Sequence, residues 1–124
     1  MAAALEVNPC VLAWFAFLHD SQRRNDGWDP AHGARAADFA VRLQRDGVLT
    51  ELTVREFDDL CVALRWHSEG QLEGEAAVRA CWDADRLDLG RVGIIPAPAR
   101  LCTTYARARP IITRAVRLSQ RRWL

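Results

Sequence analysis

Apolar residues recur at helical spacing along most of the chain. The run 11–18 is apolar on nearly every side, and Asn8 followed by Pro9 is typical of a helix start. We therefore predict a first helix from Asn8 to about Arg24, ended by the turn-forming segment 25–30. A helix without a polar face belongs in the centre of a fold.

The same periodicity predicts further helices. Thr53 and Glu56 have the spacing of a capping box, which marks the start of one of them, and Gly47 closes the helix before it. The predicted segments are about 29–46, 53–67, 73–89, 99–107 and a last one from Pro110, with Ile112, Ala115, Val116, Ser119 and Trp123 facing inward. No alternation typical of a strand extends beyond residues 92–95. We predict an all-α, compact bundle of five or six helices.

Length and charge refine this picture. The 124 residues have the size of one domain, so we predict a single helical domain over 1–124 with a basic helical segment from about residue 99. All seventeen basic residues are arginine, which excludes a Schiff-base lysine or a P-loop lysine. Residues 1–88 hold nine arginines against sixteen acidic residues, a sum of −7, whereas residues 89–124 hold eight arginines and no acid, a sum of +8.

The basic C-terminal part allows two interpretations. Six arginines between Arg107 and Arg122 could bind the phosphates of a nucleic acid. Only Tyr105 and Trp123 are available there for stacking on bases, however, and no nucleic-acid motif is visible. An arginine face that neutralises the acidic part of the same protein is the simpler account, so we predict no nucleic-acid partner.

The spacing of the cysteines and the length of the apolar run indicate the cellular compartment of the protein. Cys10, Cys61, Cys81 and Cys102 lack the short spacings of a zinc knuckle or a redox motif, which favours free thiols in a reducing environment. The run 11–18 is too short for a membrane span and lacks the basic start of a signal peptide. We predict a cytoplasmic protein with no membrane partner.

Ionisable residues lie on or beside the inward faces of four predicted helices. They include all three histidines of the chain: the set is His19, Asp20, His32, His67 and Asp85. Imidazole nitrogens and carboxylate oxygens form a mixed ligand set suited to iron, manganese, zinc or magnesium. A single histidine on an apolar face is more often structural than a ligand. His67 lies at a helix end, where a cation is favoured, and Asp85 can pair with Arg86, so the metal site is predicted from the set rather than from any one residue.

Two segments carry a resemblance to a known family. Residues 15–20, Phe-Ala-Phe-Leu-His-Asp, resemble the signature of the HD-domain superfamily of metal-dependent phosphohydrolases. Residues 83–88, Asp-Ala-Asp-Arg-Leu-Asp, are similar to the family's closing segment, whose Ala-Asp-Arg-Leu string supplies the last aspartate ligand. The stretch 20–33 is also similar to one small bacterial subgroup, and the resemblance covers residues 8–95.

The resemblance implies an HD-like fold and a set of metal ligands. His19 and Asp20 would bind a divalent ion from the end of the first helix, and Asp85, rather than Asp83, would complete its coordination. His32 and His67 match the positions that hold a second ion in two-metal members. The implied cofactor is one or two ions of manganese, iron, magnesium or zinc.

The implied activity is hydrolysis of a small phosphorylated or nucleotide substrate. Asp20 would be the catalytic residue that bridges two ions, with a water between them as the nucleophile on phosphorus. Arg23 and Arg24 follow His19 and Asp20 by one helical turn and could clamp the substrate phosphate, or they could be solvated arginines at a helix end.

One feature departs from the family pattern. Its members carry an earlier histidine ligand on a preceding helix, and the eighteen residues before His19 contain no histidine. Either the chain is truncated upstream of Met1, or it is a catalytically depleted HD-fold protein with a binding or scaffold role. Without that helix, Trp14 and Phe17 would be uncovered on the central helix, which favours a homodimer or a hetero-oligomer.

Overall fold

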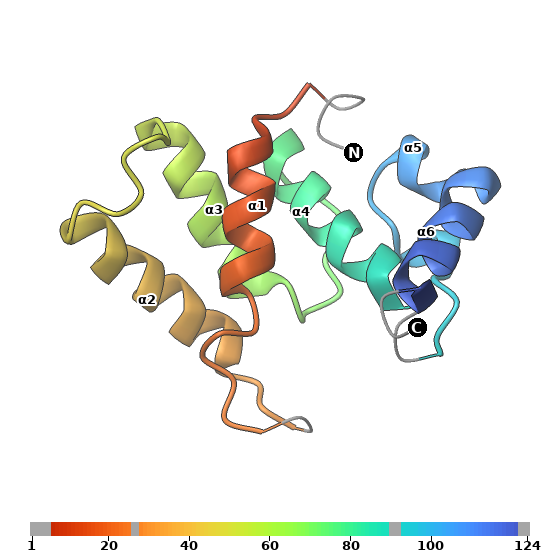
Figure 1. Ribbon diagram of the computed structural model, residues 1–124, viewed down its shortest axis with the longest axis horizontal. Helices are drawn as coiled ribbons and strands as arrows, with labels where there is room; N and C mark the ends of the chain where they lie inside the picture. The colour runs from red at the N-terminus through yellow and green to blue at the C-terminus, as the bar shows by residue number, and fades with distance from the viewer. Residues whose placement is uncertain (1–5, 26–27, 90–92, 122–124) are drawn as a thin grey trace.

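The structure is a computed structural model that describes residues 6–25, 28–89 and 93–121, and these ranges contain helices and no strand. The prediction of an all-α protein is therefore confirmed (Figure 1). Five helices are substantial and a sixth is a single turn. They are α1 (Pro9–Leu18), α2 (His32–Arg45), α3 (Val54–Trp66), α4 (Ala76–Leu87), α5 (Thr104–Arg107) and α6 (Arg109–Arg121), with a short 3-10 turn at Pro98–Arg100. Trp123, predicted to face inward, lies outside the described residues.

Local sequence signals start the helices as predicted. Asn8 caps α1 by accepting a hydrogen bond from the backbone N–H of Cys10 at 3.0 Å. Both hydrogen bonds of the capping box at Thr53 and Glu56 are present at the start of α3. Gly47 follows α2 with a φ of 78°, a conformation that glycine adopts without strain.

The predicted end of the first helix is wrong. α1 ends at Leu18, six residues before Arg24. The Ser21 hydroxyl donates to the carbonyl of Leu18 at 2.7 Å, and the backbone turns at Asp20 through short-range hydrogen bonds. Polar side chains that bond nearby backbone groups compete with the helix in this way. The helix end consequently places His19 and Asp20 in a turn.

The prediction of one continuous helix over 99–107 is also wrong, because the structure has two separate short turns of helix there. An extended stretch at Leu101–Thr103 separates the 3-10 turn from α5. The fully buried Asp83 of α4 accepts hydrogen bonds there from the backbone N–H of Cys102 at 2.6 Å and that of Thr103 at 2.9 Å. Those two N–H groups are then unavailable to a continuous helix.

The main core lies among α1, α2, α3 and α4 (Figure 1). Phe15, Leu60 and Trp82 are fully buried in it, and the indole N–H of Trp82 donates to the carbonyl of Ala63 at 3.0 Å. A smaller cluster joins α5 and α6 to the end of α4 through Leu87, Leu101, Ala106 and Ile112. The four cysteines are free, as predicted.

One face of α1 is not covered by the rest of the described chain. Val11, Phe15 and Leu18 are buried, but the ring of Phe17 is 71% exposed. Trp14 packs edge-on against Phe17 and donates its indole N–H to the carboxylate of Glu51. Across the described ranges, no helix is both long enough and apolar enough to cross a membrane.

Candidate metal centre

Two buried histidines meet where α2 begins and α3 ends. His32 is the first residue of α2, and His67 directly follows α3. Their Nε2 atoms lie 2.9 Å apart. Gly33 makes this approach feasible, because a Cβ atom at that position would lie 2.6 Å from the carbonyl oxygen of Arg65 and 2.7 Å from that of Leu64. Only a residue without a side chain lets the two helix ends lie this close.

Backbone carbonyls orient all three imidazoles. The Nδ1–H of His32 donates to the carbonyl of Asp29 at 2.5 Å, and that of His67 donates to the carbonyl of Leu64 at 2.7 Å. His19 is oriented in the same way by the carbonyl of Phe15 at 3.1 Å. Since a carbonyl can only accept, Nδ1 carries the proton and a neutral ring presents the Nε2 lone pair. Two such lone pairs at 2.9 Å repel each other unless a proton or a metal cation lies between them.

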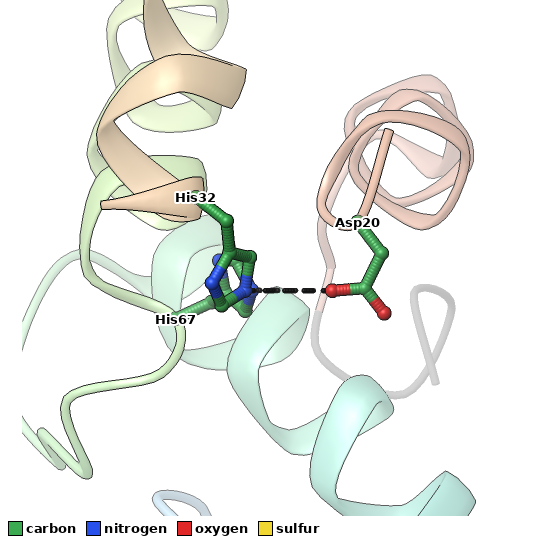
Figure 2. A group of neighbouring side chains, drawn as sticks. All are labelled: Asp20, His32 and His67. Atoms are coloured by element: carbon green, nitrogen blue, oxygen red, sulfur yellow. Dashed lines mark hydrogen bonds and ion pairs between the residues drawn. The ribbon is translucent and has the colours of Figure 1, made fainter. Parts of the chain in front are cut away.

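Asp20 completes a three-ligand group with this histidine pair (Figure 2). Its Oδ1 lies 3.5 Å from Nε2 of His32 and 3.8 Å from Nε2 of His67. The two nitrogens, 2.9 Å apart, and Oδ1 of Asp20 form a triangle. The centre of the circle through its three corners lies about 2.0 Å from each atom. That is the usual length of a bond from a first-row divalent metal to nitrogen or oxygen.

The charge state of Asp20 suits a metal ligand. The contact with His67 holds the pKa of this carboxyl far below its ordinary value, and the charges of His19 and Arg23 act in the same direction. Asp20 is therefore ionised at neutral pH. Its side chain is 42% exposed, so the group is open to solvent and to a ligand from this side.

His19 connects the second oxygen of Asp20 to α4. Nε2 of His19 lies 3.4 Å from Oδ2 of Asp20 and 3.3 Å from Oδ1 of Asp85. Burial lowers the pKa of His19, but the hydrogen bond with Asp85 and the charges of both carboxylates outweigh it and raise the pKa above the ordinary value. The structure thus brings all five predicted ligands together, with one oxygen of Asp20 facing His32 and His67 and the other facing His19.

The two aspartates of the 83–88 segment have different surroundings. Asp83 is fully buried, and its oxygens are used by the backbone N–H groups of Cys102 and Thr103 and by the Thr103 hydroxyl at 2.8 Å. Asp85 faces His19 instead. Of the two, only Asp85 has a carboxylate directed at the histidine cluster.

The two predicted phosphate-binding arginines differ as well. Nε of Arg23 lies 3.6 Å from Oδ1 of Asp20, so this guanidinium is at the site. The contact recorded for Arg24 is through its backbone N–H, which donates to Asp29 at 2.8 Å. The structure brings Arg23 to the histidine cluster and gives no such contact for the Arg24 side chain.

Sequence reasoning missed the residues that position His32. The carboxylate of Asp29 is held by Arg35 at 2.5 and 2.6 Å, and its backbone carbonyl orients the imidazole. The N–H of Arg24 and the guanidinium of Arg35 together lower the pKa of Asp29. The turn-forming pair Asp29-Pro30 before His32 was the available signal, and Gly33 was the other.

Comparison with protein families, with curated proteins and with solved structures finds no match for this chain.

Proposed function

We propose that this protein is a metal-dependent phosphohydrolase of the HD type, which hydrolyses a small phosphorylated or nucleotide substrate. The observation that carries the proposal is the group formed by Oδ1 of Asp20 and Nε2 of His32 and His67. One point lies at metal-bond distance from all three atoms, and the two nitrogens face each other at 2.9 Å.

The donor set fits a divalent ion of manganese, iron, zinc or magnesium. Such an ion would lower the pKa of a bound water and neutralise charge on the phosphoryl oxygens. Three protein ligands leave further coordination positions for that water and for a substrate oxygen. In the reaction, the water oxygen bonds to phosphorus, the ester P–O bond breaks, and the released oxygen takes up a proton to give an alcohol and inorganic phosphate.

The residues around the group have distinct roles in this proposal. Asp20 would hold an ion through Oδ1, and Oδ2 would be available to a second ion at His19 and Asp85. An ion there would need the neutral form of the His19 ring, since only that form is a ligand. Arg23, beside Asp20, is positioned to pair with a phosphate oxygen. Arg24 is the second candidate for that role, although the contact given for it is through its backbone N–H.

A specific observation favours a second candidate, a catalytically depleted HD-fold protein with a binding or scaffold role. In the described residues a single group of three has ligand atoms that all lie within 4.8 Å of one another. His19 is instead held between two carboxylates. Elemental analysis of the purified protein separates the two candidates, because absence of bound metal in a folded protein favours the binding role.

Activity measurements test the enzyme proposal. The protein is incubated with Mn²⁺ or Fe²⁺ and a panel of nucleotides and phosphomonoesters, and wild type is compared with Asp20→Ala. We expect Asp20→Ala to lose activity by more than about 100-fold, since even the loss of an outer-shell partner costs 10- to 100-fold. Asp38→Ala, the same change in a carboxylate that is 70% exposed and pairs with Arg65, is the control and should retain activity. Equal activity in wild type and Asp20→Ala, or no activity in either with metal demonstrably bound, would overturn the proposal.

A further inference from the structure

A cavity of about 500 Å³ adjoins the candidate metal centre. It lies between the segment after α3, the end of α4 and residues 94–101. His67, a ligand of the proposed metal ion, forms part of its wall. His67 is thus shared by the metal centre and the cavity wall.

Most of the described wall is apolar. Leu89, Ile94, Ile95, Pro96 and Leu101 contribute to it, and Ile95 and Ile94 are 75% and 51% exposed. Large apolar side chains exposed around a cavity mark a surface that an apolar ligand group could cover. The polar side chains in the described wall are those of His67, Ser68, Arg86 and Arg100.

Two arginines give the cavity a positive charge. Neither Arg86 nor Arg100 has a carboxylate partner within 4.0 Å in the ranges that the structure describes. Arg86 is held in place, since its Nη1 donates to the carbonyl of Arg100 at 3.1 Å and its guanidinium lies 5.6 Å from the ring centre of Trp82. Its Nη2 is buried without an acceptor among the described residues. This atom is closed off from solvent and cannot itself bind a ligand in the cavity, but no carboxylate in the described part of the chain balances the charge of the pre-positioned guanidinium, which therefore attracts an anionic group.

We propose that this cavity binds the organic group of the substrate, and that the substrate is a small phosphomonoester with an apolar organic group. This inference rests on the proposed function and narrows its substrate class. In this arrangement the phosphate would lie beside His67, and Arg86 and Arg100 of the same wall would balance its charge. The apolar group lies against Ile94 and Ile95.

The composition of the wall disfavours a nucleoside in this position. Recognition of a base and a ribose uses side-chain donors and acceptors, such as amides, carboxylates and hydroxyls. The described wall offers no carboxylate and no side-chain amide. A polar sugar or base would leave its own hydrogen-bonding groups unpaired against apolar side chains.

Binding to the metal-free protein tests the inference without relying on catalysis. Hexyl phosphate, adenosine 5′-monophosphate and inorganic phosphate are titrated calorimetrically into wild type in the presence of EDTA. We expect hexyl phosphate to bind at least about 10-fold more tightly than either of the others, because it alone fills the apolar part of the cavity. Equal or tighter binding of adenosine 5′-monophosphate would overturn the inference.

Variants locate the binding. Ile95→Glu and Arg100→Gln change exposed residues and should each weaken hexyl phosphate binding about 10-fold or more. Val54→Glu, at a valine that is 78% exposed at the start of α3, is the matched control and should bind as wild type. Circular dichroism confirms that each variant is folded, and unchanged affinity in Ile95→Glu and Arg100→Gln would refute this location.

The two proposals fail separately. Tight binding of hexyl phosphate that both cavity variants weaken supports the cavity, even when the Mn²⁺-loaded protein hydrolyses no phosphomonoester. Metal-dependent hydrolysis that Asp20→Ala abolishes, together with hexyl phosphate binding that no cavity variant changes, supports the activity and refutes the cavity.

Discussion

Replacing Gly33 by alanine should disturb the metal centre without touching any of its ligands. The added Cβ would meet the carbonyl oxygen of Arg65 at 2.6 Å and that of Leu64 at 2.7 Å, and both atoms belong to backbone. The Leu64 carbonyl also accepts the hydrogen bond that orients His67. Relief of these contacts to an ordinary separation of about 3.4 Å needs α2 and α3 to move apart by several tenths of an ångström.

A movement of that size is large for a metal site. Ligands must be held to within about 0.5 Å of the productive geometry, and overpacking of this kind costs about 1–3 kcal/mol. We therefore expect Gly33→Ala to lower the free energy of unfolding by about 1–3 kcal/mol and to weaken Mn²⁺ binding about 10- to 100-fold. Thermal unfolding measures the first quantity, and calorimetric titration of Mn²⁺ measures the second.

Gly74→Ala is the matched control. Its added Cβ would first meet a side-chain atom of Val78, at 3.4 Å, which is an ordinary contact. This variant should keep the stability and the Mn²⁺ affinity of wild type. If Gly33→Ala also behaved as wild type in both measurements, the close approach at Gly33 would not set the geometry of the site.

Four further predictions concern the ligands, the fold and the surface. Mn²⁺ at a free concentration of 100 times its dissociation constant should raise the free energy of unfolding by about 2.7 kcal/mol. The melting temperature should rise accordingly and EDTA should reverse the rise, whereas equal melting curves with and without Mn²⁺ would contradict this prediction. Asp83→Ala should lower the free energy of unfolding by at least about 3 kcal/mol, because it leaves two buried N–H groups unpaired; denaturant titration measures this. Asp85→Ala should change that free energy little but should weaken metal binding, which calorimetric titration measures. The pKa values of Asp20 and Asp29 are held below the ordinary value of 3.8, so their contribution to stability is full above that pH and is lost as the pH falls through the lower folded-state values. Asp29→Asn should therefore make the loss of stability in acid less steep. If the exposed face of α1 mediates a homodimer, sedimentation should show concentration-dependent dimers that Phe17→Glu abolishes, and a monomer at all concentrations would refute the dimer.

Much of the candidate site follows from reading polar residues on apolar helical faces. That pattern indicates Asp20, His32 and His67, which form the three-ligand group of the structure. Their mutual distances were not predictable from sequence, because they depend on how closely α2 approaches α3. That approach depends on Gly33, whose role becomes visible only when the carbonyl groups of the neighbouring helix are placed.

Features that depend on near neighbours along the chain are predictable from the residues alone. Helical periodicity, the Asn8 cap and the capping box of Thr53 and Glu56 involve residues within a few positions of one another, and the structure contains them as predicted. Two other features depend on contacts between distant parts of the chain: the approach of α2 to α3 at Gly33, and the extended stretch that separates α5 from the turn before it. Asp83 determines the second of these from about twenty positions away, because a buried carboxylate must be satisfied and the N–H groups of Cys102 and Thr103 are the donors that packing brings to it.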